Sequence, residues 1–424
     1  MELFKRLSKQ LWPYSSDLRD PNVGMGKTVT LGLQHTFTMF GATVLVPILT
    51  GFDISVALFM AGVGTLLFHL LTKGGVPIFL GSSFAFIAPT IAASAAYGKE
   101  YALGGIVIAG LLYVILGLLV KWLGSKRVLG FFPPIVTGPV IMVIGLGLEP
   151  VAVGMANESW VLAGLAIAVV IFVTVFLKGF AKSLPVLIGL AASYGIAALI
   201  TVFGWAKLVD FSPIAEAAWF GIPRFTVAKF DLGAIVLIAP VAIITFVEHV
   251  GDIIAAGTIC GQDFVKRPGL LRTLLGDGLA TSLSAMFGGP ANTTYSENTG
   301  VLALTRAINP AIMRIAALFA IALGICPKLG AFISTIPTPI IGGISIVLFG
   351  MIASVGLRTL GENKVDFQLD RNVLIASVIL GFGIGGAVLS IYVGSINISL
   401  QGMAYAALAG IILNKVLPGA QTYS

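Results

Sequence analysis

The sequence predicts an all-α polytopic membrane protein, on the basis of its composition and of the length of its apolar stretches. Of the 424 residues, 57% are hydrophobic and 10% are charged, whereas about 25% of the residues in a typical soluble domain are charged. The mean hydropathy is +1.03. Apolar stretches long enough to cross the ~30 Å hydrocarbon core of a bilayer follow one another along the chain.

Fourteen membrane-spanning segments can be drawn through these stretches, and the third and the tenth are short and interrupted by Gly and Pro. The expected ranges are 28–50, 53–72, 78–95, 102–122, 131–151, 161–177, 183–204, 233–258, 268–287, 292–305, 308–327, 333–356, 372–394 and 399–418. The preceding stretch, 1–27, begins with the basic amphipathic run MELFKRLSKQLW and is expected on the cytoplasmic face, as an interfacial helix and not a cleaved signal peptide. The longest polar link, 205–232, is expected to be a structured outer loop.

The basic residues orient these segments. Twenty of the 25 Lys and Arg residues fall in the N-terminal segment, at the C-terminal end, or in the alternate links that belong to the same side. The other five are Lys99, Lys207, Arg224, Lys229 and Lys328. Cytoplasmic loops carry an excess of Lys and Arg. Both termini are therefore expected in the cytoplasm, with the protein in the cell (inner) membrane.

The two halves of the chain resemble each other. Gln34-His35 matches Glu248-His249 at an offset of 214, and the run 77–84 matches the interrupted run through Tyr295 at about 212. A third match, Pro134 with Pro339, has an offset of 205. A repeat of seven segments is odd, so the second copy would insert upside down. Inverted repeats with paired broken helices are typical of secondary transporters with a site near the membrane midplane.

Residues 288–306 form a polar run, GGPANTTYSENTGVLALTR, among apolar stretches. Its Gly-Gly-Pro start disfavours a continuous helix, and a carboxylate at membrane depth costs about 2.5–3.5 kcal/mol on insertion scales. Non-helical backbone at that depth is tolerated only where protein buries it or where it lines a cavity. We therefore expect a broken element facing a polar site; the alternative is a loop outside the membrane.

Four acidic residues lie well inside the expected segments: Glu248, Asp252, Asp277 and Glu297. No Lys or Arg lies as deep, so these acids must be protonated, hydrated or bonded to a polar ligand. Glu248 and Asp252 are four residues apart and share one face of a helix. Asp277, between two glycines, is more typical of a structural hydrogen-bond centre than of a ligand-binding group. His35 is a further titratable group near the site, while His249 points about 100° away from Glu248.

A flat aromatic ligand would suit such a site. Carboxylates accept hydrogen bonds from ring N–H groups, backbone N–H groups at broken helices donate to ring carbonyls, and Phe84 or Tyr295 can pack on the ring face. Neither a cofactor nor a metal is expected, because the two cysteines, Cys260 and Cys326, lie in or beside apolar segments and belong to no ligand cluster.

The motifs LQHTFTMFGATVLVP, GSSFAF, FVEHVGD and YSENTGVLALTR together resemble the nucleobase–ascorbate transporter (nucleobase:cation symporter) family, and most of all its bacterial uracil permeases. The likeness spans about residues 28–415. The family signature is met by Glu297, Asn298, Gly300, Thr305 and Arg306.

This resemblance implies a fold and a set of roles. Fourteen segments would form a seven-plus-seven inverted repeat, with short antiparallel strands in segments 3 and 10. A core domain would hold segments 1–4 (28–128) and 8–11 (233–328), and a gate domain segments 5–7 (129–204) and 12–14 (329–418). It also implies that Glu248 and Glu297 bind substrate through their carboxylates, and Phe84 and Ser296 through their backbone. By the same resemblance Tyr295 and His35 would support the site.

Two departures bear on selectivity. Uracil permeases of this type have a His where this chain has Asp252, and a Tyr near Phe349. Glu at position 297, in contrast, favours the pyrimidine branch over xanthine and urate transporters, which have Gln there.

The expected function is import of uracil by proton symport with alternating access, in contact with the lipid bilayer and without nucleic acid. Proton coupling would involve Glu297, Glu248 or Asp252, with His35, Asp277 and Asn298 in support. A homodimer is a further expectation. The alternatives are a xanthine, uric acid or other oxopurine symporter of the same family, and an inorganic anion transporter of similar architecture. An enzyme is not expected, because the segments contain no catalytic triad, metal cluster or phosphate loop.

Overall fold

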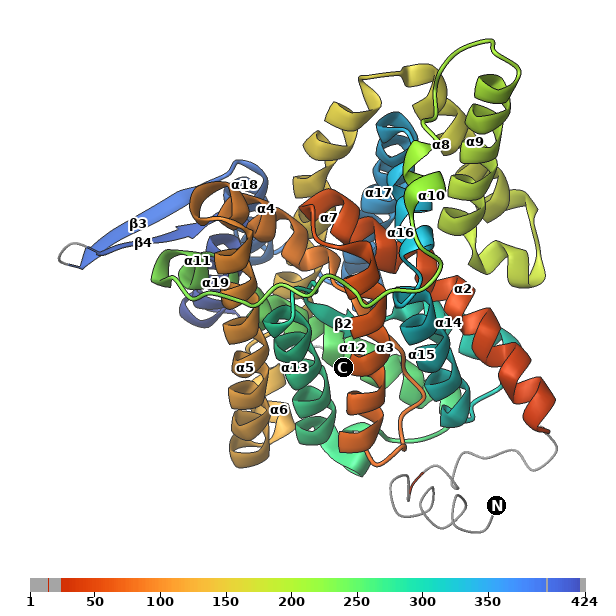
Figure 1. The fold of residues 1–424 in the computed structure, drawn as a ribbon. Coiled ribbons are helices and arrows are strands. Elements are labelled where there is room, and N and C mark those ends of the chain that lie inside the picture. The colour runs from red at the N-terminus through yellow and green to blue at the C-terminus, as the bar shows by residue number, and fades with distance from the viewer. Residues whose placement is uncertain (1–13, 15–23, 394–395, 420–424) are drawn as a thin grey trace.

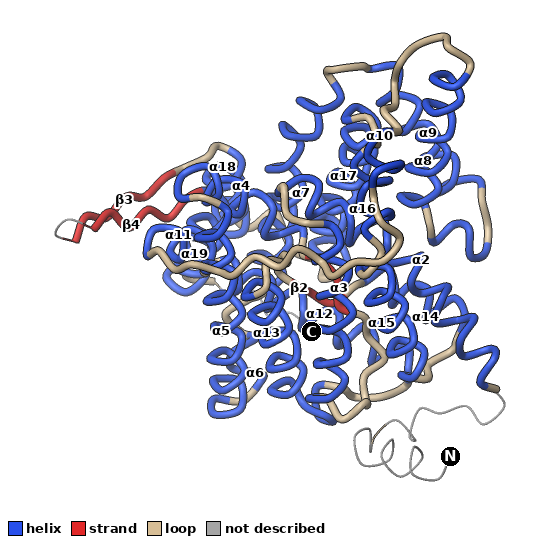
Figure 2. The backbone as a smooth tube through the Cα atoms, viewed as in Figure 1, coloured by secondary structure: helices blue, strands red, loops and turns tan. Residues whose placement is uncertain are grey.

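The computed structural model describes residue 14 and residues 24–393 and 396–419, and this part of the chain is mostly helical (Figures 1 and 2). The expected cytoplasmic segment 1–27 lies almost entirely outside the described residues. The first half contains α2 (Met25–Thr50), α3 (Ile54–Leu71), β1 (Leu80–Ser82), η2 (Phe84–Phe86), α4 (Ile87–Tyr97), α5 (Lys99–Leu123), α6 (Ser125–Leu129), α7 (Pro134–Ala156), α8 (Trp160–Phe176), η3 (Gly179–Ser183) and α9 (Pro185–Val202).

The second half begins after the short helix α10 (Ser212–Glu216). It contains α11 (Leu232–Ile238), α12 (Val241–Cys260), η4 (Val265–Gly269), α13 (Leu270–Met286), β2 (Asn292–Thr294), α14 (Ser296–Thr305), α15 (Pro310–Gly324), α16 (Pro327–Ser334), α17 (Thr338–Glu362), α18 (Asp370–Ile384), β3 (Val388–Val393), β4 (Ile396–Gln401) and α19 (Gly402–Val416).

Seven helical stretches in the described part are long and apolar enough to cross a membrane. They are α2, α3, α5, α7, α9, the stretch Leu232–Cys260 that joins α11 to α12, and α17. The bent pair of α15 and α16, with 76° between its parts, would make an eighth, and shorter apolar helices include Trp160–Phe176 and Gly402–Val416. The chain is therefore an integral membrane protein with a mainly helical fold.

The structure departs from the expected segments 372–394 and 399–418. Helix α18 ends at Ile384, and residues 388–401 form the antiparallel hairpin β3–β4, in which Val388 pairs with Gln401 and Val393 with Ile396. The hairpin projects from the helices in Figure 1. The second strand, INISLQ, alternates apolar and polar residues with a period of two, the first, VLSIYV, is rich in β-branched and aromatic residues, and only two residues separate the strands, which is the pattern of a hairpin. The expected segments were wrong here because residues 388–401 are apolar enough on average to extend a membrane-spanning helix.

The helices pack in two groups. In one, α7 packs against α17 and α18, α17 against α8, and α8 against α9. In the other, α13 packs against α5 and α3, and α15 against α3 and α2. Small residues allow close packing, as is common between helices in membranes. At Gly145 of α7, for example, an added Cβ would lie 2.4 Å from the carbonyl oxygen of Phe349 in α17.

Two links tie the ends of the helices together. The long link after α9 is ordered along the helix ends, where Thr226 N donates to Phe287 O (3.2 Å) and Lys229 N to Glu100 O (2.9 Å). The side chains of Lys229 and Glu100 also form an ion pair, which raises the pKa of Lys229. At another face, Tyr14 N donates to Lys73 O (3.1 Å), and the Arg267 guanidinium lies 4.4 Å from the Tyr14 ring centroid. The links after α3 and after α12 therefore meet at one face.

Candidate functional site

The centre of the site is the ribbon formed by β1 and β2. The strands are antiparallel, with Leu80 opposite Thr294, Gly81 opposite Thr293 and Ser82 opposite Asn292, and all six residues are buried. Each strand leads within two residues into a short helix, η2 followed by α4 in the first half and α14 in the second. The chain breaks its helices here because Gly-Gly-Pro before β2 and the run Gly81-Ser82-Ser83, which begins in β1 and ends just after it, disfavour helix.

The four acids lie around this ribbon, and the carboxylates of two of them have no hydrogen-bond partner in another described residue. Among the described residues, no other residue hydrogen-bonds to the carboxylate of Glu248 in α12 or of Glu297 in the first turn of α14. Glu297 and its neighbour Ser296 are exposed, and Glu248 is partly exposed. These two carboxylates are therefore available to a ligand.

Asp252, in contrast, is fully engaged by the protein. Its Oδ2 accepts from Thr294 Oγ1 at 2.5 Å and its Oδ1 from Ser296 Oγ at 2.7 Å. Only 8% of Asp252 is exposed. Two hydroxyl donors suit an ionised carboxylate. Asp252 thereby ties α12 to the end of β2 and the start of α14, and brings Glu248, one turn earlier, to the same region as Glu297.

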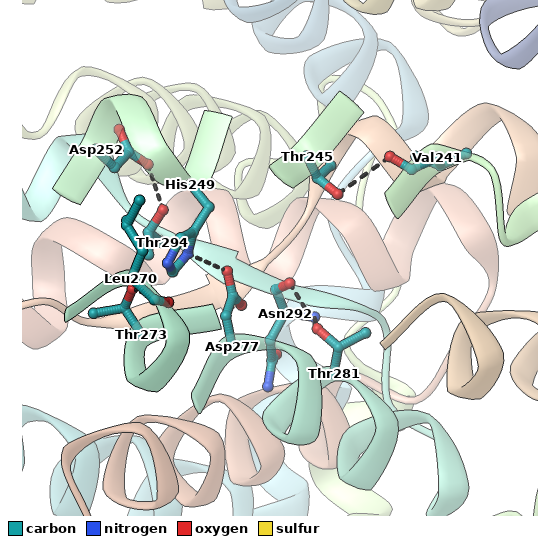
Figure 3. A network of polar contacts seen from close by, with 10 residues as sticks. All are labelled: Val241, Thr245, His249, Asp252, Leu270, Thr273, Asp277, Thr281, Asn292 and Thr294. Atoms are coloured by element: carbon teal, nitrogen blue, oxygen red, sulfur yellow. Dashed lines mark hydrogen bonds and ion pairs between the residues drawn. The ribbon is translucent and has the colours of Figure 1, made fainter. Parts of the chain in front are cut away.

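Asp277 is engaged as well, by a histidine. Its Oδ2 lies 2.7 Å from His249 Nδ1, and neither side chain is exposed. Figure 3 shows this pair between α12 and α13, beside the bond between Asp252 and Thr294. The Tyr113 ring of α5 meets His249 edge-on at 6.3 Å. The expectation that His249 points away from Glu248 is explained here, because the imidazole is directed toward α13.

Tyr295 pins the ribbon to α2. Its hydroxyl donates to Ser82 O at 2.9 Å and accepts from Thr43 Oγ1 at 3.2 Å, and only 2% of the residue is exposed. The Tyr295 ring is thus enclosed by protein. A substrate-binding role for Tyr295 stays a prediction, and the structure gives it a definite packing role.

His35 and Asn298 join α2 to α14. Asn298 Nδ2 donates to His35 O at 3.0 Å and lies 3.1 Å from His35 Nδ1. Both residues are 0% exposed. They hold the helix that carries Glu297 against α2, and their supporting role in proton coupling stays a prediction.

Phe84 begins η2 and is partly exposed. Its ring meets the buried ring of Phe349 in α17 edge-on, with 6.4 Å between centroids. This aromatic pair bridges the two helix groups beside the ribbon. Glu248 also lines an apolar cavity shared by α7, α12 and α19, which includes Val140, Ile244 and Ala407.

The electrostatics of the site are dominated by acids. Within the described ranges, no Lys or Arg forms an ion pair with any of the four, and no group of three or more His, Cys, Asp or Glu residues could hold a metal ion. The side chains that sequence reasoning overlooked are hydroxyls: Thr43, Thr65, Thr281 and Thr294. Thr294 lies in the polar run 288–306, and the signal for the other three is their presence within otherwise apolar segments.

The fold places the chain in a class of membrane proteins. It resembles the transmembrane domain of a cyanobacterial bicarbonate transporter, BicA, with a TM-score of 0.65 and 15% identity, covering 91% of this chain and 96% of that one. It also resembles murine Slc26a9, an anion transporter in the inward-facing state, with a TM-score of 0.69 and 10% identity, covering 97% of this chain and 71% of that one. At these identities the likeness concerns the fold alone.

The sequence comparisons are more specific. Residues 26–392 match the model of a permease family. A probable uracil permease of Haemophilus influenzae is 46% identical, over 92% of this chain and 94% of that one. The uracil permease of Bacillus caldolyticus is also 46% identical (95% and 94%), and a putative pyrimidine permease of Escherichia coli is 40% identical (94% and 91%). The chain belongs to this permease family, the nucleobase–ascorbate transporter family that its motifs indicated.

Proposed function

We propose that this permease imports uracil across the cell membrane by proton symport with alternating access. One observation carries the proposal: of the four acids around the ribbon, the carboxylates of Glu248 and Glu297 have no hydrogen-bond partner in another described residue, while those of Asp252 and Asp277 are already engaged. Uracil has two N–H donors and two carbonyls, which match two acceptors and the backbone donors of a broken helix. The names of relatives at 46% identity support the same substrate.

The proposed architecture has fourteen segments in a seven-plus-seven inverted repeat. Segments 1–4 and 8–11 would form the core domain, and segments 5–7 and 12–14 the gate domain. The packing of the helices into two groups supports this division. The core would move against the gate and carry the ribbon and both free carboxylates between the two faces. Both termini would be cytoplasmic.

A carboxyl group at the site would carry the coupled proton. No cation of the described chain neutralises Glu297 or Glu248, so protonation is the available means of discharging them during movement through the low-dielectric interior. Glu297 is the first candidate because it follows the ribbon directly and is exposed. Glu248 is the second, with His35 as a relay.

The decisive experiment is uptake of radiolabelled uracil in cells that lack their own uracil uptake, with and without a protonophore. Uracil should accumulate, and the protonophore should abolish accumulation. Glu297→Gln should retain binding but lose both accumulation and pH dependence, whereas Glu158→Gln, at an exposed residue between α7 and α8, should behave as wild type. A Glu297→Gln variant with the wild-type pH profile would move the coupling role to Glu248.

Competition distinguishes the alternatives. Uracil should compete and adenine should not, because a buried polar group left unpaired by a mismatched edge costs affinity strongly. Stronger competition by xanthine than by uracil would identify an oxopurine symporter. Uptake of bicarbonate or sulfate by a protein that does not bind uracil would identify an anion transporter.

A further inference from the structure

The ribbon has a local two-fold axis through the pair Gly81–Thr293. This axis exchanges Leu80 with Asn292 and Ser82 with Thr294. The bonds just beyond the strands obey the same symmetry: Ser83 N donates to Ala291 O (2.9 Å), and Tyr295 N donates to Phe79 O (3.1 Å). The two strands are therefore equivalent at the level of individual backbone hydrogen bonds.

Each strand is also held by a threonine of the preceding helix. Leu80 N donates to Thr65 Oγ1 of α3 at 2.9 Å, and this hydroxyl lies 2.8 Å from Ala61 O of its own helix and 3.2 Å from Leu80 O. In the other half, Asn292 N donates to Thr281 Oγ1 of α13 at 3.2 Å, and the same hydroxyl donates to Asn292 O at 2.9 Å. The two-fold axis exchanges Leu80 and Asn292, so the threonines engage equivalent strand residues.

A second side chain on each helix repeats the pattern one turn further on. His69 Nε2 lies 3.0 Å from Ile78 O, and Ser284 Oγ donates to Pro290 O at 2.6 Å. Ile78 and Pro290 are again equivalent, because they lie two residues before Leu80 and Asn292, respectively. Both helices thus hold the backbone of their strand at two matching points, and Thr65, His69, Thr281 and Ser284 are all buried.

The physical need for these contacts follows from the shape of the ribbon. A two-stranded ribbon leaves the N–H and C=O groups on its outer edges unpaired. Inside a membrane protein no bulk water is present to satisfy them, and each unsatisfied group is costly. A threonine hydroxyl can accept from an N–H and donate to a C=O. Thr281 serves both groups of Asn292 in this way, and Thr65 accepts from Leu80 N while its proton lies between Ala61 O and Leu80 O. Valine has nearly the same shape and can do neither.

We propose that Thr65 and Thr281 are a matched pair of positioning residues that fix the two strands relative to their helices and so set the geometry of the substrate site. Phe84 follows Leu80 by four residues, and Ser296 follows Asn292 by four, directly before the free carboxylate of Glu297. A shift of either strand therefore displaces groups at the site. This proposal rests on the proposed function for its substrate.

The test uses the purified full chain and the variants Thr65→Val and Thr281→Val, with Thr273→Val as the matched control. Thr273 lies in α13, is 0% exposed, and its hydroxyl donates only to Leu270 O within its own helix (3.1 Å). The Kd for uracil should rise about tenfold in both test variants and stay within about twofold of wild type in the control. Thr65→Ser and Thr281→Ser keep the hydroxyl and should restore the affinity. If valine yields no folded protein, Thr→Cys, with its weaker hydrogen bonding, takes its place.

Hydrogen–deuterium exchange gives a readout that needs no substrate. Peptides covering 78–84 and 290–296 should exchange faster in the test variants than in Thr273→Val. Test variants with wild-type Kd and wild-type exchange, or with a lowered Tm as their only change, would overturn the proposal. If the wild-type protein fails to bind uracil, the proposed function is wrong, and exchange alone then decides on the two threonines.

Discussion

Replacing Gly81 by alanine tests whether the packing between the ribbon and Tyr295 holds the site together. A Cβ at position 81 would lie 2.3 Å from Cζ of Tyr295 and 2.8 Å from Oγ1 of Thr43. An ordinary contact begins at 3.4 Å, so the Tyr295 ring would have to move by about 1.1 Å. It has little space to do so, because Tyr295 is only 2% exposed.

The cost has two parts. Moving the ring away from β1 would lengthen the bond from the Tyr295 hydroxyl to Ser82 O, now 2.9 Å, beyond hydrogen-bond range. A buried polar group left unsatisfied costs about 1–3 kcal/mol, and overpacking of a core adds about 1–3 kcal/mol. Gly81→Ala should therefore destabilise the protein by about 2–6 kcal/mol and disturb the strand that leads to Phe84.

Thermal unfolding of the purified protein, followed with and without uracil, measures this effect. Gly81→Ala should lower the Tm by several degrees and weaken uracil binding. Gly164→Ala is the control, because a Cβ there meets nothing within 4 Å and alanine favours helix. Combining Gly81→Ala with Tyr295→Val should cost less than the sum of the single changes, since the smaller side chain makes room for the methyl group. Wild-type Tm and affinity for Gly81→Ala would refute the reasoning.

Four further predictions concern the acids, the C-terminal helix and the topology. Asp252→Asn removes the negative charge and replaces one of the two oxygens that accept from Thr294 and Ser296 by an NH2 donor, so the Kd for uracil, measured by calorimetry, should rise about five- to hundredfold. An unchanged Kd would show that this contact between α12 and α14 is dispensable. His249→Leu leaves a buried carboxyl without its partner and should cost about 3–5 kcal/mol, seen as lost folded protein on size exclusion. Arg371 Nη2 donates to Asn414 O near the end of α19 at 2.7 Å. Arg371→Met leaves this carbonyl without its donor and should lower the Tm, and Arg371→Lys should recover part of the loss. Equal Tm values for the wild type and both variants would contradict this. In a background without native cysteines, a membrane-impermeant maleimide added outside intact cells should label a cysteine at Glu158 but not one at Lys178, and the reverse pattern would exclude the proposed orientation.

The sequence alone was informative about the environment of the chain. Hydropathy predicted a membrane protein, since a bilayer imposes length and apolarity on each segment regardless of its neighbours. The Gly-Gly-Pro start of 288–306 and the offset between the halves indicated a broken element with a partner near residue 80, and β1 and β2 lie in these two stretches. The hairpin at 388–401 shows the limit of this reasoning, because segment length was given more weight than the alternation that marks strands.

Tertiary structure decided which acids are free. In sequence all four are carboxyl groups at membrane depth with no cation as deep, and only Asp277, between two glycines, indicated a structural role. Asp277 finds its partner 28 residues away on a neighbouring helix, and Asp252 finds its two hydroxyls 42 and 44 residues away, across the break between α13 and α14. A hydrogen bond depends on distances of about 3 Å and on direction. Periodicity along one helix gives the face on which an acid lies. Only the packing of the helices decides whether a donor reaches that face, as at Asp252 and Asp277, or whether the carboxylate is left open to a ligand, as at Glu248 and Glu297.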